Sequence, residues 1–288
     1  MSKKPRDLSG NVVLITGGAR GIGRSTAAAL VAQGARVVVA DLDLALAQQA
    51  AKDLGGGTVA RQVDVTDHPA FTALLDDVQT TVGPLDVLIN NAGVMSVRPF
   101  VEDTFESAYR QFAVNVFALM HGTREAIKRM QPRQRGHIVN VASMGGVVAM
   151  PGAAAYCSSK HAVVGFCEAL RWELVGSGID LSYVLPALVN TELAADVKRT
   201  RASNVIEPED VAAAIVGTLR KPKLAVYVPK SLGPVTRYGV LMPAKLGDKL
   251  MTASGSDHLL FDSLGGAGRA AYEARVAASA PAADRTLH

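Results

Sequence analysis

The chain has 288 residues, of which 49% are hydrophobic and 19% charged, so it can bury a core and is not disordered as a whole. Its formal net charge is +4 and only 5% of its residues are aromatic, which argues against a nucleic-acid-binding surface. Cys157 and Cys167 fall on different turns of one predicted helix, so we expect two free thiols and a reducing, cytoplasmic environment. The histidines show no metal-ligand spacing, and we expect no metal site.

Short apolar runs alternate with helical patterns through most of the chain. The predicted strands are 12–15, 37–40, 59–65, 87–89, 137–141, 181–185 and 224–228. The predicted helices are 22–32, 44–54, 68–82, 104–130, 154–175 and 208–219. Strands this rich in Val, Ile and Leu are typical of parallel sheets covered on both faces. The pattern predicts an α/β fold with a doubly wound, seven-stranded parallel sheet of Rossmann type.

A glycine-rich segment, residues 16–23, lies between the first predicted strand and the first predicted helix. Gly17 permits a tight turn, Gly21 lets the backbone approach a pyrophosphate, and Gly23 lets helix and strand pack closely. The free N–H groups at the start of the helix favour phosphate binding. The segment therefore predicts a dinucleotide site.

Asp41 follows the second strand, where a carboxylate can bind the adenine ribose hydroxyls and repel a 2′-phosphate. This favours NAD. Arg20, inside the glycine segment, favours the alternative, NADP, because its charge can approach a 2′-phosphate. A second interpretation of Asp41 is that it only caps the next helix.

Tyr156 and Lys160 are four residues apart at the start of the helix after the fifth strand, so they share one face. A nearby ammonium stabilises a phenolate, and we expect Lys160 to lower the pKa of Tyr156. Ser143 follows the fifth strand, at the sheet edge where α/β proteins bind ligands. Its hydroxyl can hold a substrate carbonyl.

Together these motifs make the chain resemble the short-chain dehydrogenase/reductase family over about residues 8–230. The motifs that carry the resemblance are Thr16-Gly17-x-x-x-Gly21-Ile22-Gly23, Asp64-Val65, Asn90-Asn91-Ala92-Gly93, Asn115, Ser143, Tyr156-x-x-x-Lys160 and Thr191 after Pro186. The residues beyond, 231–288, form a C-terminal extension of the single domain.

The resemblance implies a role for each matching residue. The implied catalytic residues are Asn115, Ser143, Tyr156 and Lys160. The implied cofactor-binding residues are Gly17, Arg20, Gly21, Ile22, Gly23, Asp41, Asp64, Val65, Asn91, Ala92, Gly93, Tyr156, Lys160, Pro186, Val189 and Thr191. Asp64 and Val65 would contact the adenine, Asn115 would hold a water that relays protons from Lys160, and Thr191 would bind the carboxamide. The family usually has Pro-Gly where this chain has Pro186-Ala187, so an alanine at positive φ would be strained there.

The predicted activity is NAD-dependent hydride transfer between a secondary alcohol and its ketone, with Tyr156 as the general acid and base. An NADPH-dependent carbonyl or ketoacyl reductase is the alternative, and a catalytically silent cofactor-binding sensor is a weaker one. Apolar residues at 94–95, 144–151 and 188–189 are candidate substrate walls and favour an apolar substrate. They could also simply seal the core.

The C-terminal extension is open to several interpretations. The basic and apolar residues at 220–251 could form a lid, a subunit contact or a peripheral membrane contact. Residues 277–288 are rich in Ala and Pro, and we expect them to be poorly ordered. Apolar positions on helices 104–130 and 154–175 exceed what one sheet face can cover, which predicts a homodimer or homotetramer.

Overall fold

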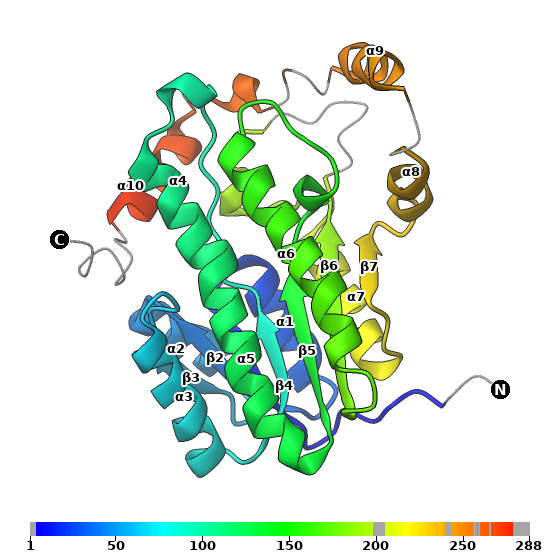
Figure 1. The fold of residues 1–288 in the computed structure, drawn as a ribbon. Coiled ribbons are helices and arrows are strands. Elements are labelled where there is room, and N and C mark those ends of the chain that lie inside the picture. The colour runs from blue at the N-terminus through cyan, green and yellow to red at the C-terminus, as the bar shows by residue number, and fades with distance from the viewer. Residues whose placement is uncertain are drawn as a thin grey trace.

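The computed structural model describes residues 4–197, 205–239, 243–255, 258, 260–264 and 266–278. Its centre is one sheet of seven strands in the order β3-β2-β1-β4-β5-β6-β7 (Figure 1). The strands all pair in parallel: β1 (Val12–Thr16), β2 (Arg36–Asp41), β3 (Val59–Gln62), β4 (Leu85–Asn90), β5 (Gly136–Val141), β6 (Ile179–Pro186) and β7 (Ala225–Val228). The predicted fold class is confirmed.

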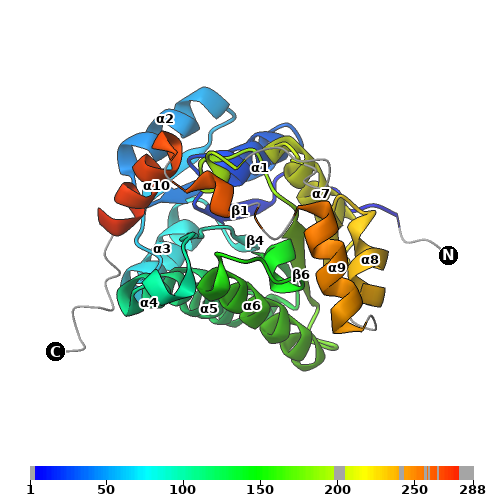
Figure 2. The same cartoon turned by 90° about the horizontal axis from the view of Figure 1, so that it is seen from above.

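Helices cover both faces of the sheet, which gives three layers (Figure 2). One face carries α1 (Gly21–Val31), α2 (Leu44–Leu54) and α7 (Pro208–Arg220). The other carries α3 (His68–Thr81), α4 (Phe105–Phe112), α5 (Leu119–Met130) and α6 (Ala154–Glu173). Short 3-10 turns lie in the loops: η1 (Phe100–Glu102), η3 (Gln131–Arg133), η4 (Met144–Gly146) and η5 (Glu192–Ala194).

Strand β1 shows why the apolar runs contain no polar alternation. Val13 and Ile15 point into the core beneath α1 and α7, whereas Val12 and Leu14 point into the core beneath α3 and α5. All four side chains are at most 2% exposed. Alternate residues of a strand point to opposite faces, so a strand buried on both faces must be apolar throughout.

Two predicted elements need correction. Strand β3 ends at Gln62 instead of residue 65, because the Asp64 carboxylate accepts hydrogen bonds from the backbone and hydroxyl of Thr66 and turns the chain. The predicted helix 104–130 is not continuous: a π-helical turn, η2 (Ala113–Ala118), separates α4 from α5. Turns of this kind are frequent at functional sites, and η2 contains Asn115.

The sheet places the site at a topological switch point. Strands β1 and β4 are neighbours, but from β1 the chain continues towards β2 and β3, and from β4 towards β5 and β6. The connections after these two strands therefore diverge, and open α/β sheets bind ligands at the carboxyl ends of strands arranged in this way. The glycine segment follows β1, and Asn91 follows β4.

The C-terminal extension returns to this carboxyl edge. Helices α8 (Leu232–Gly239) and α9 (Ala244–Ser254) follow β7, and then η6 (Phe261–Ser263) and α10 (Ala267–Ala278). In Figure 2, α10 lies far from α9, on the side of α2 and α4. We expected residues 277–288 to be poorly ordered, which is wrong for Ala277 and Ala278, because α10 includes both. Residues 279–288 lie outside the described residues.

Within the described ranges, no helix has both the length and the apolar character needed to cross a membrane. The basic side chains that the structure describes in segment 220–251 are exposed: Arg220, Lys221, Lys223, Lys230, Lys245 and Lys249. A peripheral contact through this segment stays a prediction.

Candidate active site

The glycine turn after β1 is packed so tightly that side chains would not fit. A Cβ atom on Gly23 would lie 2.2 Å from the Gly17 carbonyl oxygen and 2.7 Å from Asn91 Nδ2. Gly17 itself has φ of +60°, and a Cβ there would lie 2.9 Å from the Ala92 Cα. The glycines thus serve the tight turn and the close packing that the sequence predicts.

Helix α1 begins in this turn with its N–H groups available to an anion. No side chain caps its N-terminus in the part of the chain that the structure describes, and its first turn has no acidic residue. The uncapped amides and the partial positive charge of the helix end suit a diphosphate. Ile22, also assigned to the cofactor site, packs partly against the core.

The turn after β4 is hydrogen-bonded to the glycine turn. Asn91 Nδ2 donates to the carbonyl oxygens of Thr16 and Gly17, at 3.0 and 2.9 Å. The Thr16 hydroxyl in turn accepts from the backbone N–H groups of Asn91 and Ala92, at 3.1 and 3.2 Å. A role here was predicted for Asn91 but not for Thr16, although Thr16 opens the glycine motif.

Asp41, at the end of β2, lies against the glycine turn. Its carboxylate accepts from the backbone N–H groups of Ala19 and Asp43, at 3.1 and 3.3 Å. The cap of α2 is Asp43, which accepts from the Leu46 N–H, so the helix-cap interpretation of Asp41 is wrong. At its position the Asp41 carboxylate remains partly exposed beside the turn.

The two arginines near the glycine turn are both ion-paired. Arg20 donates to Glu192 at 3.1 Å and lies 3.9 Å from Asp43. Arg24 pairs with Asp53 at 3.1 Å. Glu192 also accepts from Arg275 of α10, at 2.6 Å. Both arginines are thus ion-paired at the surface, with side chains that are 34% and 47% exposed.

The loop after β6 reaches the glycine turn at the start of α1. Pro186 ends β6, Val189 is 7% exposed, and a Cβ on Gly21 would lie 3.2 Å from the Thr191 methyl carbon. Ala187 is not among the described residues with positive φ, so the loop carries no strain at that position. Val189 packs in the core beneath α1 and α7, which argues against its second suggested role as a substrate wall.

Asp64 and Val65 lie just beyond β3, beside β2 in the sheet order. Val65 is 9% exposed and packs in the core beneath α3, whereas one Asp64 oxygen is occupied by Thr66. Their predicted contact with an adenine stays a prediction.

Tyr156, Lys160 and Ser143 meet at the carboxyl end of β5. The Lys160 Nζ lies 5.9 Å from the centre of the Tyr156 ring and donates to the Val141 carbonyl at 3.0 Å. A Cβ on Gly145 would lie 3.3 Å from Tyr156 Cε1 and 3.5 Å from Ser143 Oγ, so this glycine lies beside both hydroxyl-bearing side chains. The structure thus brings together the three residues that the sequence assigned to the chemistry.

Asn115 joins this group through the π-helical turn. Its side chain accepts from the Val94 N–H and donates to the Val94 carbonyl, both at 2.9 Å, and donates to Ser159 Oγ at 3.0 Å. A Cβ on Gly93 would lie 3.2 Å from Asn115 Oδ1 and 3.6 Å from Lys160 Nζ. Asn115 therefore fixes the loop after β4 beside the ammonium, and the sequence missed its partner Ser159.

Burial controls the ionisation of both central groups. It raises the pKa of the Tyr156 hydroxyl, an effect that hydrogen bonding with Ser143 partly opposes. Burial also lowers the pKa of Lys160 to about 8. The expected lowering of the Tyr156 pKa is therefore wrong: burial raises that pKa despite the nearby ammonium of Lys160.

Apolar side chains surround Tyr156, which is only 6% exposed. The members of this cluster, here called the roof cluster, are Met95, Val97, Ala153, Tyr156, Cys157 and Leu260, with Met150, Leu193 and Val197 at its edge. Met95 and Met150 were predicted substrate walls, but Leu260 comes from the C-terminal extension. Both cysteines are free, as predicted.

Comparison with known proteins identifies relatives over most of the chain. The family model described as short chain dehydrogenase matches residues 11–202. A ketoacyl reductase of Nostoc is 35% identical, covering 80% of this chain and 81% of its own. A cyclopentanol dehydrogenase of Comamonas is 36% identical over 63% of this chain and 74% of its own.

Solved structures agree with this likeness. A short chain dehydrogenase/reductase from Burkholderia phymatum, in complex with NAD, has a TM-score of 0.74 and 26% identity. The similarity covers 81% of this chain and 93% of that one.

The burial of Lys160 predicts a pH dependence of stability. Between pH 8, its folded pKa, and 10.5, its ordinary value, the unfolded chain binds more protons than the folded one. The free energy of unfolding should therefore rise with pH across this window, by about 2–3 kcal/mol more in wild type than in Lys160→Met. Urea unfolding of both proteins at several pH values measures the difference, and parallel profiles would contradict the assignment.

Proposed function

Because the chain belongs to the short-chain dehydrogenase/reductase family, we propose that it is an NAD-dependent oxidoreductase that interconverts a secondary alcohol and its ketone. Residues 8–230 carry the cofactor site and the catalytic groups, and residues 231–288 are an extension. The observation that carries the proposal is the meeting of Tyr156, Lys160 and Ser143 next to an uncapped, glycine-lined helix start.

The chemistry follows from these side chains. A bound nicotinamide supplies the hydride acceptor for alcohol oxidation and the hydride donor for ketone reduction. Tyr156 removes the alcohol proton during oxidation and returns one to the carbonyl oxygen during reduction. Ser143 donates a hydrogen bond to the same oxygen and holds it within reach of the phenol.

Lys160 and Asn115 support the proton transfer. The ammonium lies beside the Tyr156 ring, where its positive charge favours the phenolate and opposes the effect of burial. The Lys160 pKa of about 8 keeps a proton available close to neutrality. Asn115 holds the Val94 backbone beside Lys160, where a water could connect the ammonium with solvent.

Asp41 supports the choice of NAD. Its carboxylate lies beside the glycine turn and can accept hydrogen bonds from ribose hydroxyls, whereas a 2′-phosphate would be repelled. Arg20 and Arg24, the cations that could compensate, are engaged by Glu192 and Asp53. Reduction with NADPH is the alternative that Arg20 favours.

The substrate that fits best is apolar around the reacting carbon. The side chains nearest Tyr156 are Met, Val, Ala, Cys and Leu, which offer dispersion contacts and few hydrogen bonds. One relative is named a cyclopentanol dehydrogenase and another a sorbitol dehydrogenase, two alcohols of different polarity. The apolar lining favours the former kind.

Tyr156→Phe tests the chemical assignment. It removes the hydroxyl that exchanges the substrate proton, so kcat should fall by roughly a hundredfold or more while NADH binding is kept. Steady-state rates on an accepted alcohol and NADH fluorescence titration measure the two effects. Lys160→Ala should impair both, and a Tyr156→Phe enzyme of near wild-type rate would refute the proposal.

Asp41→Ser tests the cofactor choice. Wild type should prefer NAD by about tenfold or more, and the substitution should raise NADP use while NAD use falls. The double variant with Glu192→Gln should use NADP better still, because it releases Arg20 from its ion pair. The measurement is kcat/KM for NAD and for NADP with one alcohol in each protein. A wild-type preference for NADP would favour the reductase alternative.

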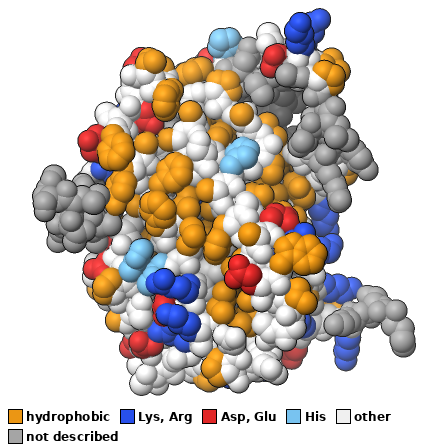
Figure 3. Space-filling model, in the orientation of Figure 1, with side chains coloured by type: hydrophobic (Ala, Val, Ile, Leu, Met, Phe, Trp, Pro, Cys, Tyr) orange, Lys and Arg blue, Asp and Glu red, His pale blue; other side chains and the backbone are white. Residues whose placement is uncertain are grey.

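We also propose that the chain self-associates through the face formed by α4, α5 and α6. Val116, Leu119 and Val163 are apolar side chains of η2, α5 and α6 that are buried in the protein. Phe117 of η2 and Trp172 of α6 are instead 47% and 67% exposed. Figure 3 shows apolar side chains gathered over this face. A second copy would bury them.

Light scattering tests this association. Wild type should have at least the mass of a dimer at micromolar concentration, and Phe117→Asp should shift it towards the monomer. Leu246→Asp, which places the same charge on an exposed leucine of α9, is the matched control and should change nothing. A monomeric wild type would refute the proposal.

A further inference from the structure

Helix α10 is fastened across the site by one buried arginine. Arg269 is 1% exposed, and its guanidinium donates to the Leu193 carbonyl at 2.8 Å and to the Met95 carbonyl at 3.0 Å. Met95 belongs to the loop after β4 and Leu193 to the loop after β6. These strands flank β5, so one side chain spans the carboxyl end of the strand that leads to Ser143.

The start of α10 is shaped for this attachment. The Asp196 carboxylate accepts from the Arg269 N–H at 2.8 Å, which places a negative charge at the positive end of the helix. A Cβ on Gly266 would lie 2.2 Å from the same carboxylate oxygen, and one on Gly268 3.1 Å. Only glycines allow the carboxylate so close. Asp196 itself has φ of 61°.

Two side chains of the extension reach the surroundings of Tyr156. Leu260, 3% exposed, packs within the roof cluster that contains Tyr156. The Tyr272 hydroxyl of α10 accepts from the Met95 N–H at 3.0 Å. Tyr272 is close enough to Tyr156 to contribute to its raised pKa, after the larger effect of burial.

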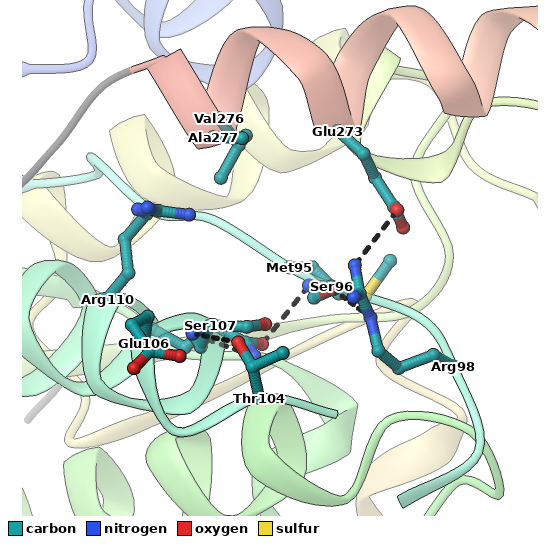
Figure 4. A pocket seen from close by; sticks show the side chains of 11 residues that line it. Met95, Ser96, Arg98, Thr104, Glu106, Ser107, Arg110, Glu273, Val276 and Ala277 are labelled. Atoms are coloured by element: carbon teal, nitrogen blue, oxygen red, sulfur yellow. Dashed lines mark hydrogen bonds and ion pairs between the residues drawn. The ribbon is translucent and has the colours of Figure 1, made fainter. Parts of the chain in front are cut away.

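The attachment of α10 depends mainly on polar contacts. A cavity of about 250 Å³ lies beside α10 and is lined by residues of α10, α4 and the loop after β4, which Figure 4 shows from close by. Val276 and Ala277 line the cavity, and Glu273 of α10 forms an ion pair with Arg98 of the loop after β4, at 3.1 Å.

We propose that Leu260 and Tyr272 are substrate-specifying residues, held over Tyr156 by Arg269 as a positioning residue. We call Leu260 and Tyr272 together the wall. The substrate class is the set of secondary alcohols that fit between Tyr156 and the wall. The wall must move when a substrate enters, because Tyr156 is buried. This inference rests on the hydride-transfer function proposed above, but the position of the wall can be tested without turnover.

The first experiment measures substrate size preference. Leu260→Ala should raise the ratio of kcat/KM for a bulky cyclic alcohol over cyclopentanol by at least about tenfold. Arg269→Ala should raise the KM for both alcohols more than it lowers kcat. Arg129→Ala is the matched control, because Arg129 is a 10% exposed arginine that pairs with Glu125 and Asp76 on the α3–α5 side. It should lower stability and leave the size preference unchanged.

The second experiment needs no activity. Cys157 lies in the roof cluster, 6% exposed, and Cys167 lies in the core, 0% exposed, so alkylation by iodoacetamide reports on the wall with an internal reference. Arg269→Ala should speed modification of Cys157 by at least about tenfold with Cys167 unchanged, and Arg129→Ala should not. Asp196→Asn is a second variant, should Arg269→Ala fail to fold.

The two experiments separate the two proposals. Faster Cys157 labelling without turnover of any alcohol would keep the wall and overturn the hydride-transfer function. An unchanged size preference in Leu260→Ala, together with unchanged Cys157 labelling in Arg269→Ala and Asp196→Asn, would overturn the wall.

Discussion

The hydrogen bonds between Thr16 and Asn91 are the constraint on which the site depends. Together with the bonds from Asn91 to Gly17 and from Ala92 to Thr16, they join the ends of β1 and β4, where the chain departs in opposite directions, and so hold the two turns together. With the two turns in contact, the start of α1 lies beside them with its amides uncapped. A single added methyl at Gly23 would separate the turns. The proposed cofactor site and the loop that Asn115 holds beside Lys160 are thus both attached to these two joined turns.

The parts of this arrangement that depend on neighbours in sequence could be predicted. The four-residue spacing of Tyr156 and Lys160 places them on one helix face whatever the tertiary context. The continuous Val and Ile runs of β1 and β2 likewise predict a sheet buried on both faces, and the glycine spacing predicts the phosphate turn.

The parts that depend on distant contacts could not be predicted. The π-helical turn around Asn115 follows from hydrogen bonds to Val94 and Ser159, which local pattern does not encode. In sequence, Arg269 is one base in an Ala-rich helix, and such residues are usually solvated. The pKa of Tyr156 was predicted in the wrong direction for a related reason: spacing reveals the nearby ammonium but not the exclusion of water.

The walls around Tyr156 come from two stretches of the chain with different relations to the family. The family model ends at residue 202, so it contains Met95, Ala153 and Cys157 but not Leu260 or Tyr272. Resemblance across the matched stretch therefore concerns the proposed cofactor site and the proposed proton-transfer groups. Two proteins that are equally similar over this stretch can still have substrate sites of different shape, because Leu260 and Tyr272 lie outside it. In this fold, sequence similarity to relatives therefore indicates the type of reaction more readily than the identity of the substrate.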